Sequence, residues 1–148
     1  MTLIILSGLS LASLFPENSP ITSGCLWYIC LQTCLSYFVS GSVKLRKANW
    51  RSGKALAAFI ASSNYQLPML IKQLFKNPFF LFISSWSVIT MELCFPATLI
   101  NPQVCLGLIS AAFIFHIVNW YILGLNRFVF AWLAAYPAVY YCSSFLNR

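Results

Sequence analysis

Four long apolar runs dominate the chain, and polar or proline-containing breaks separate them. Three of these runs, residues 21–43, 78–100 and 102–124, reach the roughly 20 residues that an α-helix needs to cross a bilayer. The fourth, residues 128–146, carries no charged side chain. We expect it to span as well and to bend at Pro137, because proline removes one helical hydrogen bond. The pattern therefore predicts four transmembrane helices.

Residues 1–20 form a shorter apolar segment. Its apolar part, Thr2 to Phe15, is too short to span alone, so a true span, a tilted or partial helix completed by another chain, and an interfacial segment all stay open. No basic residue or small-residue cleavage signal precedes Pro16, and we expect the segment to be retained. We expect an all-α integral membrane protein, with residues 1–148 forming a single domain of four to five transmembrane helices and one basic interfacial loop or helix.

The composition supports this fold class. Hydrophobic residues make up 60% of the chain and charged residues 7%, whereas soluble domains carry about 25% charged residues. This balance excludes a soluble enzyme and a disordered tail. Nine basic residues against two acidic ones give a net charge of +7, but most of the surface must face lipid. Nucleic-acid binding needs a water-exposed basic face, so no nucleic acid is expected as a partner.

Residues 44–77 form the longest polar stretch. Seven of the nine basic residues lie in it: Lys44, Arg46, Lys47, Arg51, Lys54, Lys72 and Lys76. The positive-inside rule places this stretch on the cytoplasmic or equivalent side. Four apolar residues recur within it at near-helical spacing: Trp50, Ala55, Leu56 and Phe59. The spacing indicates an interfacial amphipathic helix that ends before Pro68, and we expect its basic side chains to contact anionic lipid headgroups.

Two ionisable side chains, Glu92 and His116, are predicted inside the membrane, where their cost indicates a role. Counted from the turn at Asn101 at about 1.5 Å per residue, Glu92 lies about 14 Å deep and His116 about 22 Å deep on the next helix. Ser87 lies at nearly the depth of His116, which predicts a hydrogen bond between them. For Glu92, a hydrogen-bonded tie between helices is favoured, and a proton carrier or a cofactor ligand are the alternatives.

Asn119 and Trp120 follow His116 at i+3 and i+4 and share its helix face. This group can either bind a ligand or pin two helices together, and we favour the second interpretation. A single histidine without a second ligand at metal spacing predicts no metal site. A hydrophobic cofactor such as a quinone, a pigment or a lipid stays open.

A motif runs through the end of the first long span and into the basic stretch. It consists of an aromatic pair, a small-Gly pair, a Lys-Leu pair, a tryptophan and a glycine: Tyr37, Phe38, Ser40, Gly41, Lys44, Leu45, Trp50 and Gly53. This order resembles the signature of the HTTM family, the membrane domain shared by vitamin K-dependent gamma-carboxylase and its bacterial relatives. The later segments 91–96, 113–128 and 134–143 are similar to the family's later helices. The resemblance covers the later half of that domain.

The resemblance implies that Lys44 would act as the base that deprotonates reduced vitamin K. Taken from the residues alone, Lys44 is instead expected to snorkel to the interface beside Arg46 and Lys47. Five further residues are candidate binding residues: Trp50, Glu92, His116, Asn119 and Trp120.

Two functional hypotheses follow. The favoured one is a non-catalytic accessory or scaffold subunit of a larger membrane complex, such as a photosynthetic or respiratory one, packed against other membrane subunits. The alternative is a carboxylase-like or quinone-handling half-enzyme with Lys44 as general base. The accessory hypothesis expects partner chains or cofactors at four aromatic residues: Trp27, Phe80, Trp86 and Trp132. The enzyme hypothesis expects Lys44 in a cavity with uncharged neighbours.

Overall fold

The computed structural model describes residues 2–14, 19–61 and 69–147. All of its regular elements are helices: α1 (Thr2–Leu14), α2 (Ser19–Arg46), α3 (Ala48–Arg51), α4 (Lys54–Ala61), α5 (Met69–Leu74), α6 (Pro78–Cys94), the 3₁₀ helix η1 (Phe95–Leu99), α7 (Pro102–Leu123) and α8 (Asn126–Leu146). Four helical segments are long and apolar enough to cross a membrane, namely α2, α6 with η1, α7 and α8. The predicted class, an all-α membrane protein, is confirmed.

Two Asn-Pro pairs set where the later spans begin. The Asn77 side chain accepts a hydrogen bond from the backbone N–H of Phe79, and that of Asn101 accepts one from Val104. Each asparagine thus satisfies an N–H that the first turn leaves unpaired, and the following proline has the backbone φ that a helix start needs. At its other end α7 stops at Gly124, whose φ of 70° is the left-handed conformation that glycine adopts easily.

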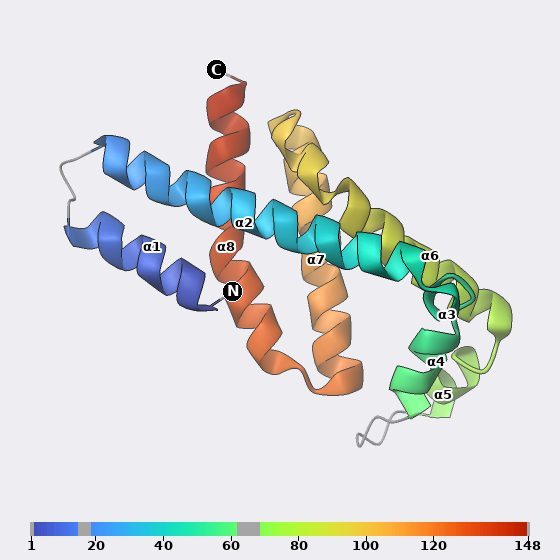
Figure 1. The fold of residues 1–148 in the computed structure, drawn as a ribbon. Coiled ribbons are helices and arrows are strands. Elements are labelled where there is room, and N and C mark those ends of the chain that lie inside the picture. Colours follow the sequence, from blue (N-terminus) through green and yellow to red (C-terminus); the bar gives the residue numbers. More distant parts are fainter. Residues whose placement is uncertain (1, 15–18, 62–68, 148) are drawn as a thin grey trace.

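The long helices cross one another. Figure 1 shows α2 (blue to cyan) passing across α7 and α8, which lie side by side, while α6 follows the second half of α2. The core lies at this crossing and contains buried residues from α2, η1, α7 and α8: Cys30, Cys34, Tyr37, Phe95, Cys105, Ala112, Tyr136, Val139 and Cys142. This crossing brings residues of four elements together in the apolar part of the molecule.

The predicted amphipathic helix is two helices. α3 and α4 are separated at Gly53, whose φ is 76°. A Cβ atom at residue 53 would lie 2.8 Å from the carbonyl carbon of Leu81 on α6, so both the conformation and the contact require glycine. The expected end before Pro68 falls outside the described residues.

At the N-terminus, α1 packs on the first half of α2. Its 13 residues extend about 20 Å, less than the roughly 30 Å hydrocarbon core. α1 therefore does not cross a bilayer of ordinary thickness on its own. In α8, Pro137 lies inside the helix without ending it, and the bend expected there stays a prediction.

Candidate functional site

An ion pair joins α2 to α6 inside the apolar region. Lys44 Nζ donates to both carboxylate oxygens of Glu92 at 2.7 Å, and it also donates to Ser40 Oγ at 2.6 Å. The Ser40 hydroxyl in turn donates to Glu92 at 3.2 Å. The side chains of Lys44 and Glu92 are 15% and 5% exposed. The expected snorkelling of Lys44 is wrong, because the ammonium group is held by a carboxylate on the neighbouring helix.

Gly41 allows the two helices to approach closely enough for this pair. A Cβ atom at residue 41 would lie 2.9 Å from the amide nitrogen of Leu93 and 3.0 Å from Glu92 Cβ. Any larger residue would push α2 and α6 apart at this level. On the other side of the pair, Lys44 Nζ lies 5.1 Å from the centroid of the Trp50 ring, which is within the range of a cation–π contact.

A second polar group is uncharged and connects α2, α7 and α8. His116 Nε2 and the Tyr37 hydroxyl are 2.7 Å apart, and the Tyr37 hydroxyl lies 3.1 Å from that of Tyr136. The imidazole stacks on the Trp132 ring, with centroids 5.4 Å apart, while Tyr37 stacks on Phe95 at 4.0 Å. The two polar groups of the membrane region thus have their own separate hydrogen-bond partners.

The predicted contact between Ser87 and His116 is wrong. Ser87 is exposed, and its hydroxyl donates to the Ile83 carbonyl of its own helix. Depths counted along the chain assume spans that are parallel to one axis, whereas α2 crosses α7. Because of that crossing, Tyr37 of α2 takes the position expected for a residue of α6.

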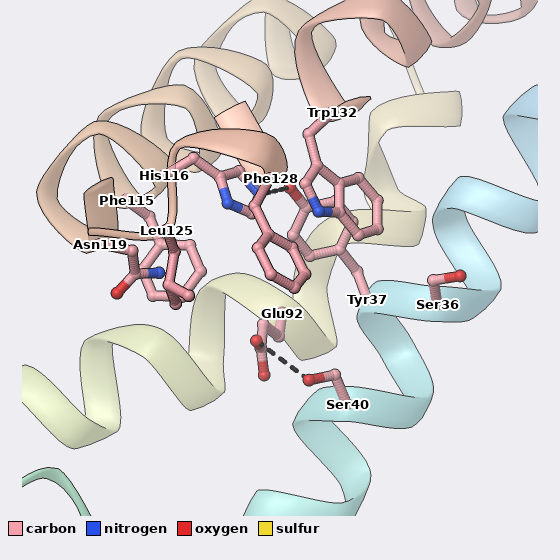
Figure 2. Close-up of a pocket in the computed structure, with 10 residues that line it drawn as sticks. All are labelled: Ser36, Tyr37, Ser40, Glu92, Phe115, His116, Asn119, Leu125, Phe128 and Trp132. Atoms are coloured by element: carbon pink, nitrogen blue, oxygen red, sulfur yellow. Dashed lines mark hydrogen bonds between the residues drawn. The ribbon is translucent and has the colours of Figure 1, made fainter. Parts of the chain in front are cut away.

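Both polar groups border one cavity of about 210 Å³. Ten residues line it: Ser36, Tyr37, Ser40, Glu92, Phe115, His116, Asn119, Leu125, Phe128 and Trp132. Figure 2 shows Glu92 and Ser40 on one side of this pocket and His116 with Tyr37 on the other. The pocket therefore combines aromatic walls with hydrogen-bonding groups at two separate places.

Three of the predicted site residues line this pocket, and three do not. Glu92, His116 and Asn119 do. Lys44 contacts the pocket residues Glu92 and Ser40 without lining the cavity itself. Trp120 is 48% exposed. Trp50 contacts Lys44 and does not line the pocket. The prediction that His116 and Asn119 share a helix face therefore agrees with the pocket lining, whereas Trp120 does not line the pocket.

The residues that sequence reasoning missed come mainly from α2 and α8. Tyr37 and Ser40 precede the predicted residue Lys44 by seven and four positions, a spacing that places all three on one face of a helix. The motif from Tyr37 to Gly53 contains this signal. Phe128 and Trp132 carry no comparable signal, because aromatic residues occur throughout the apolar runs. Among the described residues, no group of three potential metal ligands is found.

The fold and the pocket define a helical membrane protein with a partly polar cavity among its spanning helices. The HTTM domain family matches residues 10–143 of the chain. Because this match covers most of the sequence, the chain belongs to the HTTM domain family, as the motif at Tyr37 to Gly53 suggested. No curated protein and no solved structure was found to match.

Proposed function

We propose that this HTTM domain binds a membrane-soluble ring compound of the quinone class, as quinone or quinol, in the pocket between α2, α6, α7 and α8. The observation that supports it is the lining, which combines aromatic rings with hydrogen-bonding groups at two separate places. A flat ring with oxygen atoms at its edge can stack on the aromatic walls and bond the polar groups at once. The resemblance to carboxylase-like membrane proteins favours the same class of compound.

The electrostatics of the pocket favour a neutral ligand. Its one carboxylate, Glu92, is already bound by the Lys44 ammonium, so this part of the lining carries no net charge. A charged ligand would lose its hydration without gaining an opposite charge, which is costly in an apolar environment. A quinone or quinol is uncharged and avoids that cost.

The size of the pocket sets which part of the ligand it holds. A cavity of about 210 Å³ is smaller than the 300–1,000 Å³, roughly, of sites that enclose drug-sized molecules. It accommodates a ring and small substituents. A long isoprenoid tail would have to leave past Leu125 and Phe128, which line the pocket and are themselves exposed.

The proposal concerns binding and does not include catalysis with Lys44 as a base. The base would need a free lone pair, while Lys44 Nζ donates to three oxygen atoms, two of them on Glu92. The enzyme hypothesis expected uncharged neighbours, and Glu92 is a charged one. Binding of the ring compound does not depend on this step.

A second proposal, the accessory subunit of a larger membrane complex, is favoured by α1. This helix is too short to span alone, yet it exposes a row of leucines, with Leu3 81% and Leu14 71% exposed. Lipid can cover such leucines, as it can those of the long helices, and a neighbouring transmembrane helix would cover them as well. The four aromatic residues expected at such contacts all have partners within the chain. Trp27, for example, contacts Phe145, and Trp86 donates to the Arg51 carbonyl. A monodisperse monomer that binds quinone would contradict this second proposal.

The pocket proposal is tested by ligand binding in nanodiscs. Menadione, a naphthoquinone without a tail, is titrated against the protein by equilibrium dialysis, with methylnaphthalene as the ring without oxygens. His116→Phe keeps an aromatic ring and removes the hydrogen-bonding nitrogens, so we expect about tenfold weaker binding of menadione, in line with the loss of one buried hydrogen bond. The matched control is Trp120→Phe, which lies about one helical turn from His116 and outside the pocket. This variant should bind menadione as the unaltered protein does.

Two results would overturn the proposal. One is the absence of saturable menadione binding to the unaltered protein. The other is equal affinity of the unaltered protein for menadione and methylnaphthalene, since the polar groups would then contribute nothing. Circular dichroism of each variant checks that the helices are retained.

A further inference from the structure

Four exposed cations gather where α2 ends and α3 and α4 follow. This basic corner consists of Arg46, Lys47, Arg51 and Lys54, whose side chains are all exposed. Lys44 is close in sequence but does not belong to it, because its ammonium group is bound to Glu92. The structure thus separates one inward lysine from four outward cations that the sequence presents as a single run.

The positive charge of the basic corner is not balanced within the described part of the chain. Arg51 Nη1 donates to the Leu45 carbonyl, and no ion pair is found there for any of the four cations. The protein has two acidic residues in total. Glu92 is already paired, and Glu17 lies outside the described residues. An anionic partner from outside the chain would complement this surface.

The backbone that carries these cations is held firmly against α6. The Ser85 hydroxyl donates to the Trp50 carbonyl at 2.5 Å, and Trp86 Nε1 donates to the Arg51 carbonyl at 3.2 Å. Gly53 lies against the backbone of Leu81. Figure 1 shows α3 and α4 beside the start of α6. The four cations are therefore presented from a fixed scaffold, which lowers the entropy cost of binding.

The surroundings indicate which anion this surface meets. The basic corner lies at the end of α2, one of the segments apolar enough to cross a membrane. The Trp50 ring contacts the ring of the exposed Phe59 in a tilted arrangement, with the ring centroids 5.8 Å apart. Tryptophan beside basic residues at the end of an apolar span is typical of the headgroup region of a bilayer. Both features place phosphate groups of lipids within reach of the cations.

We propose that the basic corner is a binding surface for anionic phospholipid headgroups, of the phosphatidylglycerol or phosphatidylserine class. Its cations contact the lipid phosphates, and the Trp50–Phe59 pair packs at the level of the glycerol groups. This proposal does not depend on quinone binding. It also assigns the basic corner to the leaflet that holds the anionic lipid.

The experiment measures lipid preference in mixed micelles, by energy transfer from tryptophan to dansyl-labelled phosphatidylglycerol or phosphatidylcholine. A juxtamembrane cation contributes about 1 kcal/mol of attraction to anionic lipid, which is roughly fivefold in affinity. For Arg46→Gln with Lys47→Gln we expect the preference for phosphatidylglycerol to fall at least tenfold. Lys76→Gln with Arg127→Gln removes the same charge from exposed residues outside the corner. It should lower the preference by a smaller factor than the corner pair, because neither residue belongs to the cluster of four cations.

The control variant Arg46→Lys with Arg51→Lys changes side chains in the corner but keeps their charge. It should keep the preference for phosphatidylglycerol. Two outcomes overturn the proposal: no preference for phosphatidylglycerol in the unaltered protein, or equal losses in the corner pair and the control pair. Equal losses would mean that net charge alone attracts the lipid. If the protein prefers neither lipid but binds an acidic peptide, the basic corner serves a protein partner and the lipid proposal is wrong.

Discussion

The two polar groups in the membrane region of this protein achieve the same end by different means. Lys44, Ser40 and Glu92 tie α2 to α6 through a charged pair. His116, its partner Tyr37, and Tyr136, which is bonded to Tyr37, tie α2 to α7 and α8 through uncharged groups beside stacked aromatic rings. Removing the partner of a buried charge costs much stability, because the charge is left unpaired in an apolar environment. Removing the partner of a neutral polar group costs less. The comparison therefore predicts unequal sensitivity on two sides of one pocket.

Glu92→Gln should cause the largest loss. The amide cannot neutralise the Lys44 ammonium, which would be left charged among apolar side chains, and breaking such a pair costs about 3–5 kcal/mol. We expect a clear drop in the midpoint of thermal unfolding in detergent, followed by circular dichroism. The matched control replaces both partners, Lys44→Met with Glu92→Leu, and should recover most of the stability because no charge is left unpaired. Unchanged stability of Glu92→Gln would mean that the ion pair does not stabilise the protein.

Gly41→Ala tests whether the charged side of the comparison depends on close helix approach. The added methyl group would lie 2.9 Å from the amide nitrogen of Leu93, so α2 and α6 must separate, at about 1–3 kcal/mol for such overpacking. The control is Gly107→Ala in α7, where a Cβ atom has no neighbour within 4 Å. That change should be neutral or stabilising, because alanine favours a helix over glycine. Equal stability of both variants would argue against the close contact.

The sequence predicts the spans and two residues of this site, but it does not predict how the helices cross. Apolar run lengths gave the four spans, since length and hydropathy act locally. They also gave Glu92 and His116 as the residues of interest, because each is costly in lipid. Runs of this kind contain no information on crossing angles, so the calculated depths separated Glu92 from His116, although both line one pocket.

Lys44 shows a second limit of the sequence. Its neighbours Arg46 and Lys47 are exposed, and a rule based on composition treats the three alike. What distinguishes Lys44 is the helix face that it shares with Tyr37 and Ser40, together with the close approach at Gly41. The shared helix face can be predicted from the residue spacing. The close approach at Gly41 can be recognised only once the position of α6 is known. The family resemblance singled out Lys44 for the role of a base, which stays a prediction.

Tyr37→Phe should show the smaller sensitivity of the uncharged side. The change removes the hydroxyl that lies between His116 and Tyr136 and keeps the ring that stacks on Phe95. Two buried polar atoms lose a partner, at about 1–3 kcal/mol, and part of this is recovered if His116 and Tyr136 find each other or a water. We therefore expect a loss below that of Glu92→Gln in the same unfolding measurement. Tyr140→Phe in α8 is the control, since Tyr140 is exposed and should tolerate the change. If Tyr37→Phe destabilised the protein as much as Glu92→Gln, the two groups would be energetically equivalent, and the difference between charged and neutral ties would not hold here.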